Sequence, residues 1–90
     1  QHRTKTKGIR LRPKTDEHDF QVKLARARKF LEQGNKVQVT LLFRGREMAH
    51  IDLGRNLLIR FAHELEDLSS VERMPKMEGR RMTLLLNRIQ

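Results

Sequence analysis

The chain has 90 residues, of which 20 are Lys or Arg and 11 are Asp or Glu, so its formal net charge is +9 with neutral histidines. This length allows one small domain and excludes two. The absence of cysteine excludes a disulfide framework, a cysteine zinc site and thiol chemistry. No apolar run approaches the ~18 residues that a membrane span needs, so we expect a soluble, cytoplasmic, monomeric protein without a membrane partner.

The excess of positive charge favours a polyanionic partner over a small-molecule substrate. Each phosphate that Lys or Arg neutralises releases condensed counterions and adds affinity that does not depend on sequence. Nucleic acid is therefore the first expectation and an anionic membrane surface the second.

The first half of the chain predicts a strand, a helix and a strand. Residues 8–13 alternate apolar and basic side chains until Pro13, which predicts a short strand. Thr15 is expected to cap a helix over residues 16–33, with Gly34 just past its end. That helix carries one apolar stripe with i, i+4, i+7, i+11 spacing, formed by Phe20, Leu24, Ala27 and Leu31. Residues 37–43 alternate again and predict a strand that ends at a glycine turn.

The second half predicts a helix followed by a hairpin. The helix stripe is formed by Leu53, Leu57, Leu58, Phe61, Leu65 and Leu68. Gly54 lies on the same face, where a missing side chain would let the helix approach a sheet closely. Short strands over residues 71–74 and 81–87 then flank a glycine-bearing loop. The resulting β-α-β-α-β-β order predicts the α+β class, with a mixed four-stranded sheet, both helices packed on one face and the other face solvated.

The residues of an active site are not apparent in the sequence. The five glycines have neither Walker nor dinucleotide-binding spacing. The four histidines are dispersed, and the helical pair His63 and Glu66 is too small a set for a metal, so we expect no enzyme, no cofactor and no metal. All four aromatic residues are phenylalanines, three at core-facing positions and one at a stripe edge, which leaves none to stack on bases.

Basic residues gather on one helix ridge, one strand and two glycine turns. The expected RNA-binding residues are Arg10 and Arg12 in the first strand, Lys23, Arg26 and Lys29 on the helix, Arg44 and Arg46 at one turn, and Lys76, Arg80 and Arg81 at the other. Residues 47–69 are locally acidic, so this helix is expected to face away from the partner. Such a group fits contact with an RNA backbone, because guanidinium groups bind phosphate with fork geometry. The alternative interpretation is ordinary solubilising charge.

Several segments resemble a known family. The run 43–50, Phe-Arg-Gly-Arg-Glu-Met-Ala-His, closely resembles the turn into the second helix of bacterial translation initiation factor three, C-terminal domain. Residues 9–13, 19–24, 30–34 and 75–80 resemble the same domain in the same order, and the likeness extends from Lys5 to about Asn87. The resemblance implies the same β-α-β-α-β-β fold and a binding protein.

The function implied by this resemblance is binding of the small ribosomal subunit through its ribosomal RNA. It also implies that the domain hinders joining of the large subunit and supports selection of the start codon and initiator tRNA. The RNA-contacting positions of the family correspond to Arg12, Lys23, Arg60 and Arg80, and the resemblance is the sole reason to select Arg60. The family often has arginine where this chain has Ala25.

The resemblance also divides the chain. Residues 1–7 are expected to be the end of a basic interdomain connector, and residues 8–90 the C-terminal ribosome-binding domain, with the family's N-terminal domain missing. Two alternative functions stay open. One is a non-specific basic nucleic-acid-binding or RNA-chaperone protein, and the other is a structural protein of the ribosome.

Overall fold

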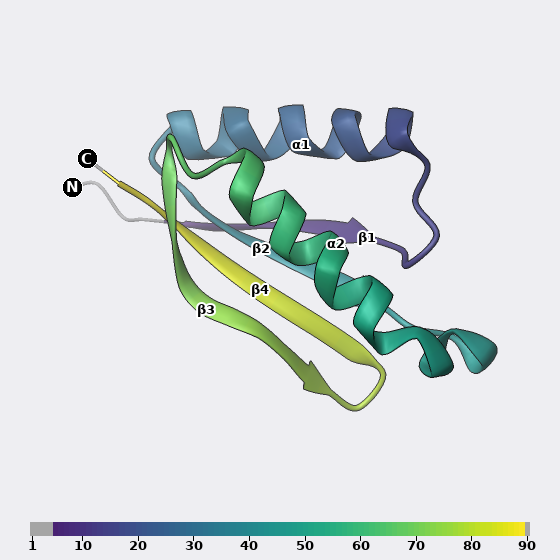
Figure 1. Ribbon diagram of the computed structural model, residues 1–90. Coiled ribbons are helices and arrows are strands. Elements are labelled where there is room, and N and C mark those ends of the chain that lie inside the picture. Colours follow the sequence, from purple (N-terminus) through teal and green to yellow (C-terminus); the bar gives the residue numbers. More distant parts are fainter. Residues whose placement is uncertain (1–4, 90) are drawn as a thin grey trace.

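The computed structural model describes residues 5–89 and contains two main helices and four strands (Figure 1). The elements are β1 (Thr6–Leu11), α1 (Glu17–Glu32), β2 (Lys36–Leu42), the 3₁₀ helix η1 (Gly45–His50), α2 (Ile51–Glu64), β3 (Ser69–Glu78) and β4 (Arg81–Arg88). The predicted β-α-β-α-β-β order and α+β class are confirmed. The short helix η1, which leads into α2, is an element that the sequence analysis did not separate.

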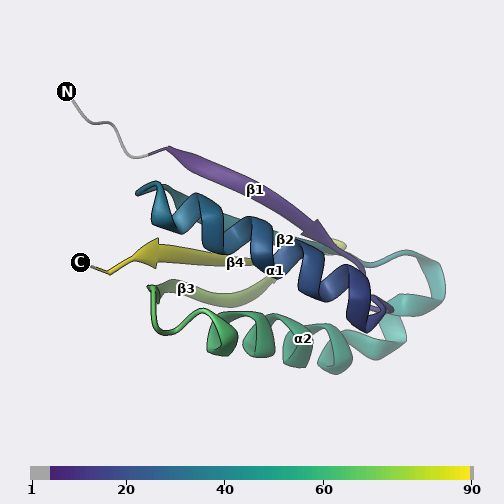
Figure 2. The same ribbon diagram turned by 90° about the horizontal axis from the view of Figure 1, so that it is seen from above.

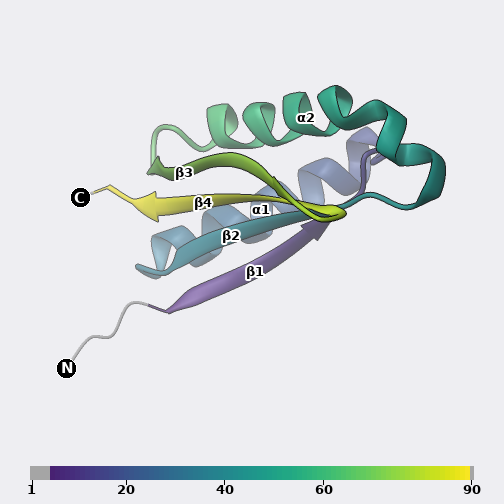
Figure 3. The ribbon, with the colours of Figure 1, turned by 90° about the horizontal axis from the view of Figure 1, so that it is seen from below.

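The four strands form one mixed sheet in the order β1-β2-β4-β3. β1 pairs with β2 in parallel, as expected for strands joined through a helix, whereas β4 pairs with both β2 and β3 antiparallel. Both helices cover the same face of this sheet (Figure 2). The view from below shows the opposite face without a covering element (Figure 3).

The core lies between this sheet and the two helices. In β2 and β4 every second residue is buried, which places Val37, Val39 and Leu41 beside Met82, Leu84 and Leu86. The predicted stripe of α1 is buried in full. Phe20 of α1 and Phe61 of α2 meet edge to face, with ring centroids 5.7 Å apart, and so join the two helices through the core.

Gly54 allows α2 to lie close to β2, as the sequence predicted. A Cβ atom at this position would lie only 2.5 Å from Cζ of Phe43 and would also overlap the Leu41 side chain. Gly34 has a φ of +88° just after the C-cap of α1, a backbone conformation that suits glycine.

The N-cap of α1 and one stripe residue of α2 differ from prediction. Asp16, and not Thr15, is the N-cap of α1, because its Oδ1 accepts a 2.7 Å hydrogen bond from the amide of Asp19. Leu53 was expected in the core but is 51% exposed. The buried line of α2 runs through Gly54, and successive residues are about 100° apart around a helix, so Leu53 falls on the flank.

Two strands also differ from their predicted bounds. β3 is longer than residues 71–74 at both ends, and β1 begins before residue 8 but ends at Leu11, before Pro13. β3 continues through Pro75, which is tolerated because β3 is an edge strand with irregular register near that residue. β1 begins at Thr6, so the last residues of the predicted connector 1–7 join the sheet, while residues 1–4 lie outside the described part. Within residues 5–89, no helix has the length and apolar character needed to cross a bilayer.

Candidate nucleic-acid interface

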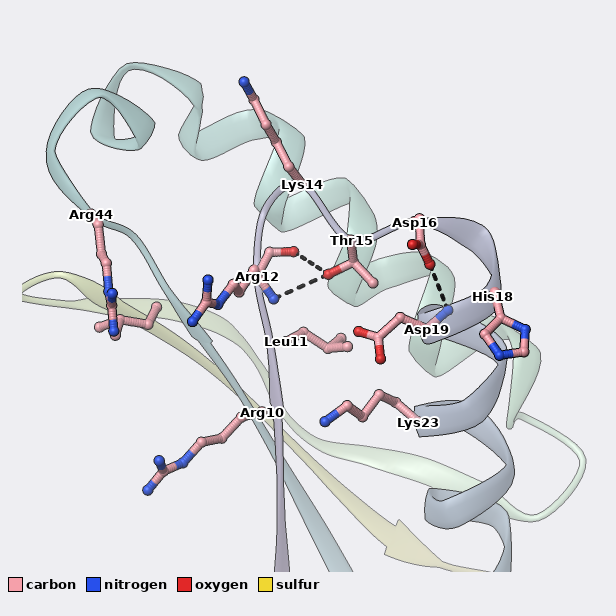
Figure 4. Close-up of a pocket in the computed structure, with 11 residues that line it drawn as sticks. Arg10, Leu11, Arg12, Lys14, Thr15, Asp16, His18, Asp19, Lys23 and Arg44 are labelled. Carbon is pink, nitrogen blue, oxygen red and sulfur yellow. Dashed lines mark hydrogen bonds between the residues drawn. The ribbon is translucent and has the colours of Figure 1, made fainter.

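A hollow of about 580 Å³ opens at the carboxyl end of β1 (Figure 4). Its cationic lining residues come from three parts of the chain and are Arg10, Arg12, Lys14, Lys23 and Arg44. Asp16 and Asp19 are the two carboxylates of the lining, so its cations outnumber its acids by three. Lys23 extends from α1 toward β1, whereas Arg44, which follows β2, lies on the other side of β1 in this view (Figure 4). The arrangement suits an anion that contacts several segments at once.

Local backbone chemistry fixes the wall of this hollow between β1 and α1. The alternation of β1 buries Leu11 and leaves Arg10 and Arg12 exposed. The amide of Arg12 donates to the Thr15 hydroxyl at 3.1 Å, and that hydroxyl donates to the Arg12 carbonyl, which closes a turn around Pro13. Asp16 then begins the helix, so the residues before and after the turn face one space.

A second hollow, of about 450 Å³, continues along β1 and reaches Thr40 of β2. Its lining includes Arg10 and Lys23, which it shares with the first hollow, and Arg26 of the next helix turn. Gly8 also lines it, and a Cβ atom at Gly8 would meet nothing within 4 Å. A cationic track therefore follows β1, with room for close approach of a ligand to the strand backbone.

The two glycine turns meet at the same end of the sheet. The amide of Phe43 donates a 2.8 Å hydrogen bond to the Arg80 carbonyl, which joins the start of the first turn to the β3–β4 hairpin. The amide of Arg44 donates to Oε1 of Glu47 at 2.9 Å, and this bond orders the entry into η1. Gly79 has a φ of +64° and so permits the tight hairpin. Arg44, Arg46, Arg80 and Arg81 are consequently grouped by two connected turns and are all exposed.

Two predicted residues lie apart from this end. Lys76 lines a separate hollow of about 360 Å³ beside β3, together with Arg73, Met74, Glu78 and Thr83. Lys29 lies farther along α1 and lines none of the three hollows. The predicted residues thus form a main group around β1 and the turns, with these two as outliers.

Ion pairing separates the cations into two sets within residues 5–89. Lys and Arg side chains within 4 Å of a carboxylate are Arg28, Lys36, Arg55 and Arg60. The ten RNA-binding residues expected from the charge pattern have no such partner in the described part of the chain. Because unpaired guanidinium and ammonium groups need not break an internal bond to bind phosphate, this second set is the better anion-binding surface.

Arg60, selected by family resemblance, belongs to the paired set. Its NH1 and NH2 donate to Oε1 and Oε2 of Glu17 at 2.9 and 2.8 Å. These hydrogen bonds lower the pKa of the Glu17 carboxyl to about 2 and raise the pKa of Arg60. In the same way, a hydrogen bond with Arg28 lowers the pKa of Asp67.

Sequence reasoning left out two cations that the structure places in the hollows. Lys14 lines the main hollow and Arg73 the one beside β3. Lys14 ends the acid-free basic run at the start of the chain, and that run was the signal that could have selected it. Arg73 is placed by register irregularities in β3, for which the sequence gives no clear signal.

The interface lacks the features of a base-stacking or metal site. Phe20, Phe43 and Phe61 are fully buried and Phe30 is partly buried against the core. Among residues 5–89, no group of three or more potential metal ligands occurs. The chemistry available to this surface is therefore electrostatic contact and hydrogen bonding to phosphate and sugar groups.

Comparison with known proteins finds one family over nearly the whole chain. The family model described as "Translation initiation factor IF-3, C-terminal domain" matches residues 4–89. Relatives named "Translation initiation factor IF-3" include one from Geobacter sulfurreducens, 51% identical over 96% of this chain and 50% of the relative. A second relative, from Thermus thermophilus, is 51% identical over 93% of this chain and 49% of the relative. A third, from Bordetella pertussis, is 55% identical over 89% of this chain and 49% of the relative. The chain spans about half the length of these relatives.

Proposed function

The chain belongs to the family of the C-terminal domain of translation initiation factor IF-3, and from this premise we propose that it binds the small ribosomal subunit through ribosomal RNA during initiation of translation. The family consists of translation initiation factors and not of enzymes. The observation that carries the proposal is the group of unpaired cations that converges on the hollow at the end of β1. This surface supports RNA contact through the backbone.

The proposed contact is electrostatic and recognises the shape of the RNA, not its base sequence. The net charge of +9 draws the chain to polyanions, and the cations around β1 and the two turns provide the local contacts. Since no aromatic side chain is available for stacking, sequence-specific readout of unpaired bases is not part of the proposal. Folded RNA presents phosphates in a fixed pattern, and that pattern supplies the specificity.

Two further activities follow from the family and are part of the proposal. A domain bound to the small subunit would hinder joining of the large subunit, and it would support selection of the start codon and initiator tRNA. Light scattering of mixed subunits tests the first activity. Undiminished formation of joined particles at a saturating concentration of bound domain would refute it for this chain.

Binding to purified subunits tests the central proposal. We expect saturable sedimentation with small subunits that persists in excess duplex DNA. If about five phosphates are contacted, the logarithm of the binding constant should fall with the logarithm of salt concentration with a slope of roughly −3.5 to −4.5. Binding that does not change with salt would refute the phosphate-contact mechanism.

Matched single variants locate the interface. Lys23→Ala and Arg44→Ala should each weaken binding about 5- to 150-fold, since a hydrogen bond to a charged group contributes roughly 1–3 kcal/mol. Arg55→Ala is the control, because it removes the same charge from a residue paired with Asp52 on α2. Equal losses for Arg44→Ala and Arg55→Ala would show that total charge, and not this surface, determines binding.

The alternative is a non-specific basic nucleic-acid-binding protein or RNA chaperone. Such a protein would use the same charges without a defined site, and duplex DNA would remove it from the small subunit. The grouping of unpaired cations at one end of the sheet favours the defined site.

A further inference from the structure

Arg60 joins the two helices through three separate contacts. Its guanidinium makes two hydrogen bonds to Glu17, the first residue of α1. The guanidinium carbon also lies 4.2 Å from the centre of the Phe20 ring, which is stacking distance for a cation over an aromatic face. Phe20 in turn packs on Phe61, one residue beyond Arg60. The arginine thus covers the edge of the core at the point where α2 meets the start of α1.

A reciprocal contact holds the other end of the helix pair. Arg28 of α1 donates to Asp67 at 2.9 Å and to the Glu64 carbonyl at 3.1 Å, at the end of α2. Each helix therefore contributes one arginine that binds the other helix. Of the two contacts, the one made by Arg60 lies nearer the main hollow. Arg60 binds the first turn of α1, and residues of that turn line the hollow.

The first turns of α1 form one wall of that hollow. His18, Asp19 and Lys23 line it, and all three follow within six residues of Glu17. We propose that Arg60 is a positioning residue, which acts on RNA binding by fixing the start of α1 through Glu17 and Phe20, and does not itself contact the RNA. This inference rests on the proposed function and revises the role that family resemblance gave to Arg60.

The charge balance at Arg60 supports this role. The Glu17 carboxylate neutralises the guanidinium and occupies two of its donors, so a phosphate at this site would compete with an existing bidentate pair. The ring of Phe20 covers one guanidinium face. By contrast, Lys23 on the same hollow wall has no carboxylate within 4 Å in the described residues and is able to contact phosphate directly.

The Glu17→Gln variant distinguishes positioning from direct contact by the sign of its effect. If Arg60 contacts RNA, removal of the competing carboxylate frees it, and binding to small ribosomal subunits should tighten. If Arg60 acts through Glu17, the same change loosens α1, and we expect binding to weaken about 2- to 5-fold, the range of an exposed ion pair. Glu66→Gln is the control, since it removes an exposed carboxylate from the acidic end of α2.

Further variants test the same point through Arg60 itself. Arg60→Ala should weaken binding at least as much as Glu17→Gln, because it removes the contact with Phe20 as well as the bonds to Glu17. The double variant should be no weaker than Arg60→Ala alone, because Arg60→Ala already removes the Glu17 contact. Arg60→Lys keeps the charge but lacks the planar fork, so it should bind as weakly as Arg60→Ala. The exchanged pair Glu17→Arg with Arg60→Glu should recover most of the loss.

Three outcomes would overturn the inference. They are tighter binding by Glu17→Gln, normal binding by Arg60→Lys beside weak binding by Arg60→Ala, and no change in any of these variants. Failure of the unaltered chain to bind small subunits would instead refute the proposed function. Thermal unfolding then tests the contact between Arg60 and Glu17 separately. If the losses of Tm in Glu17→Gln and Arg60→Ala add up in the double variant, the two residues do not stabilise the fold through one shared contact.

Discussion

Gly54→Ala should destabilise the fold, although alanine is the better helix former. In the middle of a helix, alanine is favoured over glycine by about 1 kcal/mol. At Gly54, however, the added methyl group would lie 2.5 Å from Cζ of Phe43 and would overlap Leu41, two buried side chains with little room to move. Overpacking of this kind costs roughly 1–3 kcal/mol, so we expect a net loss of about 1 kcal/mol. For a domain of this size, that loss lowers Tm by about 4–8 °C.

Gly8→Ala is the matched control for this prediction. A Cβ atom at Gly8 meets nothing within 4 Å, so the same substitution should leave Tm unchanged or raise it through the lower chain entropy of alanine. Thermal unfolding followed by circular dichroism measures both variants. An equal or higher Tm for Gly54→Ala than for the unaltered chain would refute the close approach of α2 to β2.

Two further predictions concern α1. Because the pKa of Glu17 falls from 4.5 to about 2 on pairing, the stability from this pair is present above pH 4.5 and is lost as pH falls toward 2. The free energy of unfolding of Glu17→Gln should therefore fall less steeply over that pH range than that of the unaltered chain. An unchanged pH profile would contradict the pairing of Glu17 with Arg60. Asp16→Ala should cost about 0.5–2 kcal/mol in urea unfolding through loss of the helix cap, whereas Asp16→Asn, which keeps an acceptor, should cost little. Equal losses in the two variants would show that the charge of Asp16, and not its capping bond, stabilises α1.

Periodic apolar patterns were sufficient to predict most of the fold because β1, β2, β4 and the two α-helices each bury one face. The alternation of Val37, Val39 and Leu41 and the stripe through Phe20 and Leu24 are local properties that tertiary packing did not override. The ends of elements were less predictable, since two adjacent residues, Thr15 and Asp16, are both good caps and differ only in which backbone amide each reaches.

The interface was predictable as a group of residues but not as a geometry. Clusters such as the two glycine turns are visible in the sequence, whereas the bond between Phe43 and Arg80 that brings them together is not. The pairing of Arg60 with Glu17 spans 43 positions, and nothing local to either residue signals it. Sequence reasoning therefore could not separate a cation that stabilises the fold from one that is available to RNA.

The distribution of acids explains how the chain keeps this surface available. Six of its eleven carboxylates are engaged in ion pairs with Lys or Arg or in helix-entry bonds, namely Asp16, Glu17, Glu47, Asp52, Asp67 and Glu72. Their Lys and Arg partners line none of the three hollows: Arg28 and Arg60 lie where the two helices meet, Arg55 pairs within α2, and Lys36 begins β2. The remaining cations repel one another around β1 and the turns, and a bound polyanion would relieve that repulsion. The fold thus uses most of its acids for its own stability and leaves the excess positive charge where the proposed RNA contact needs it.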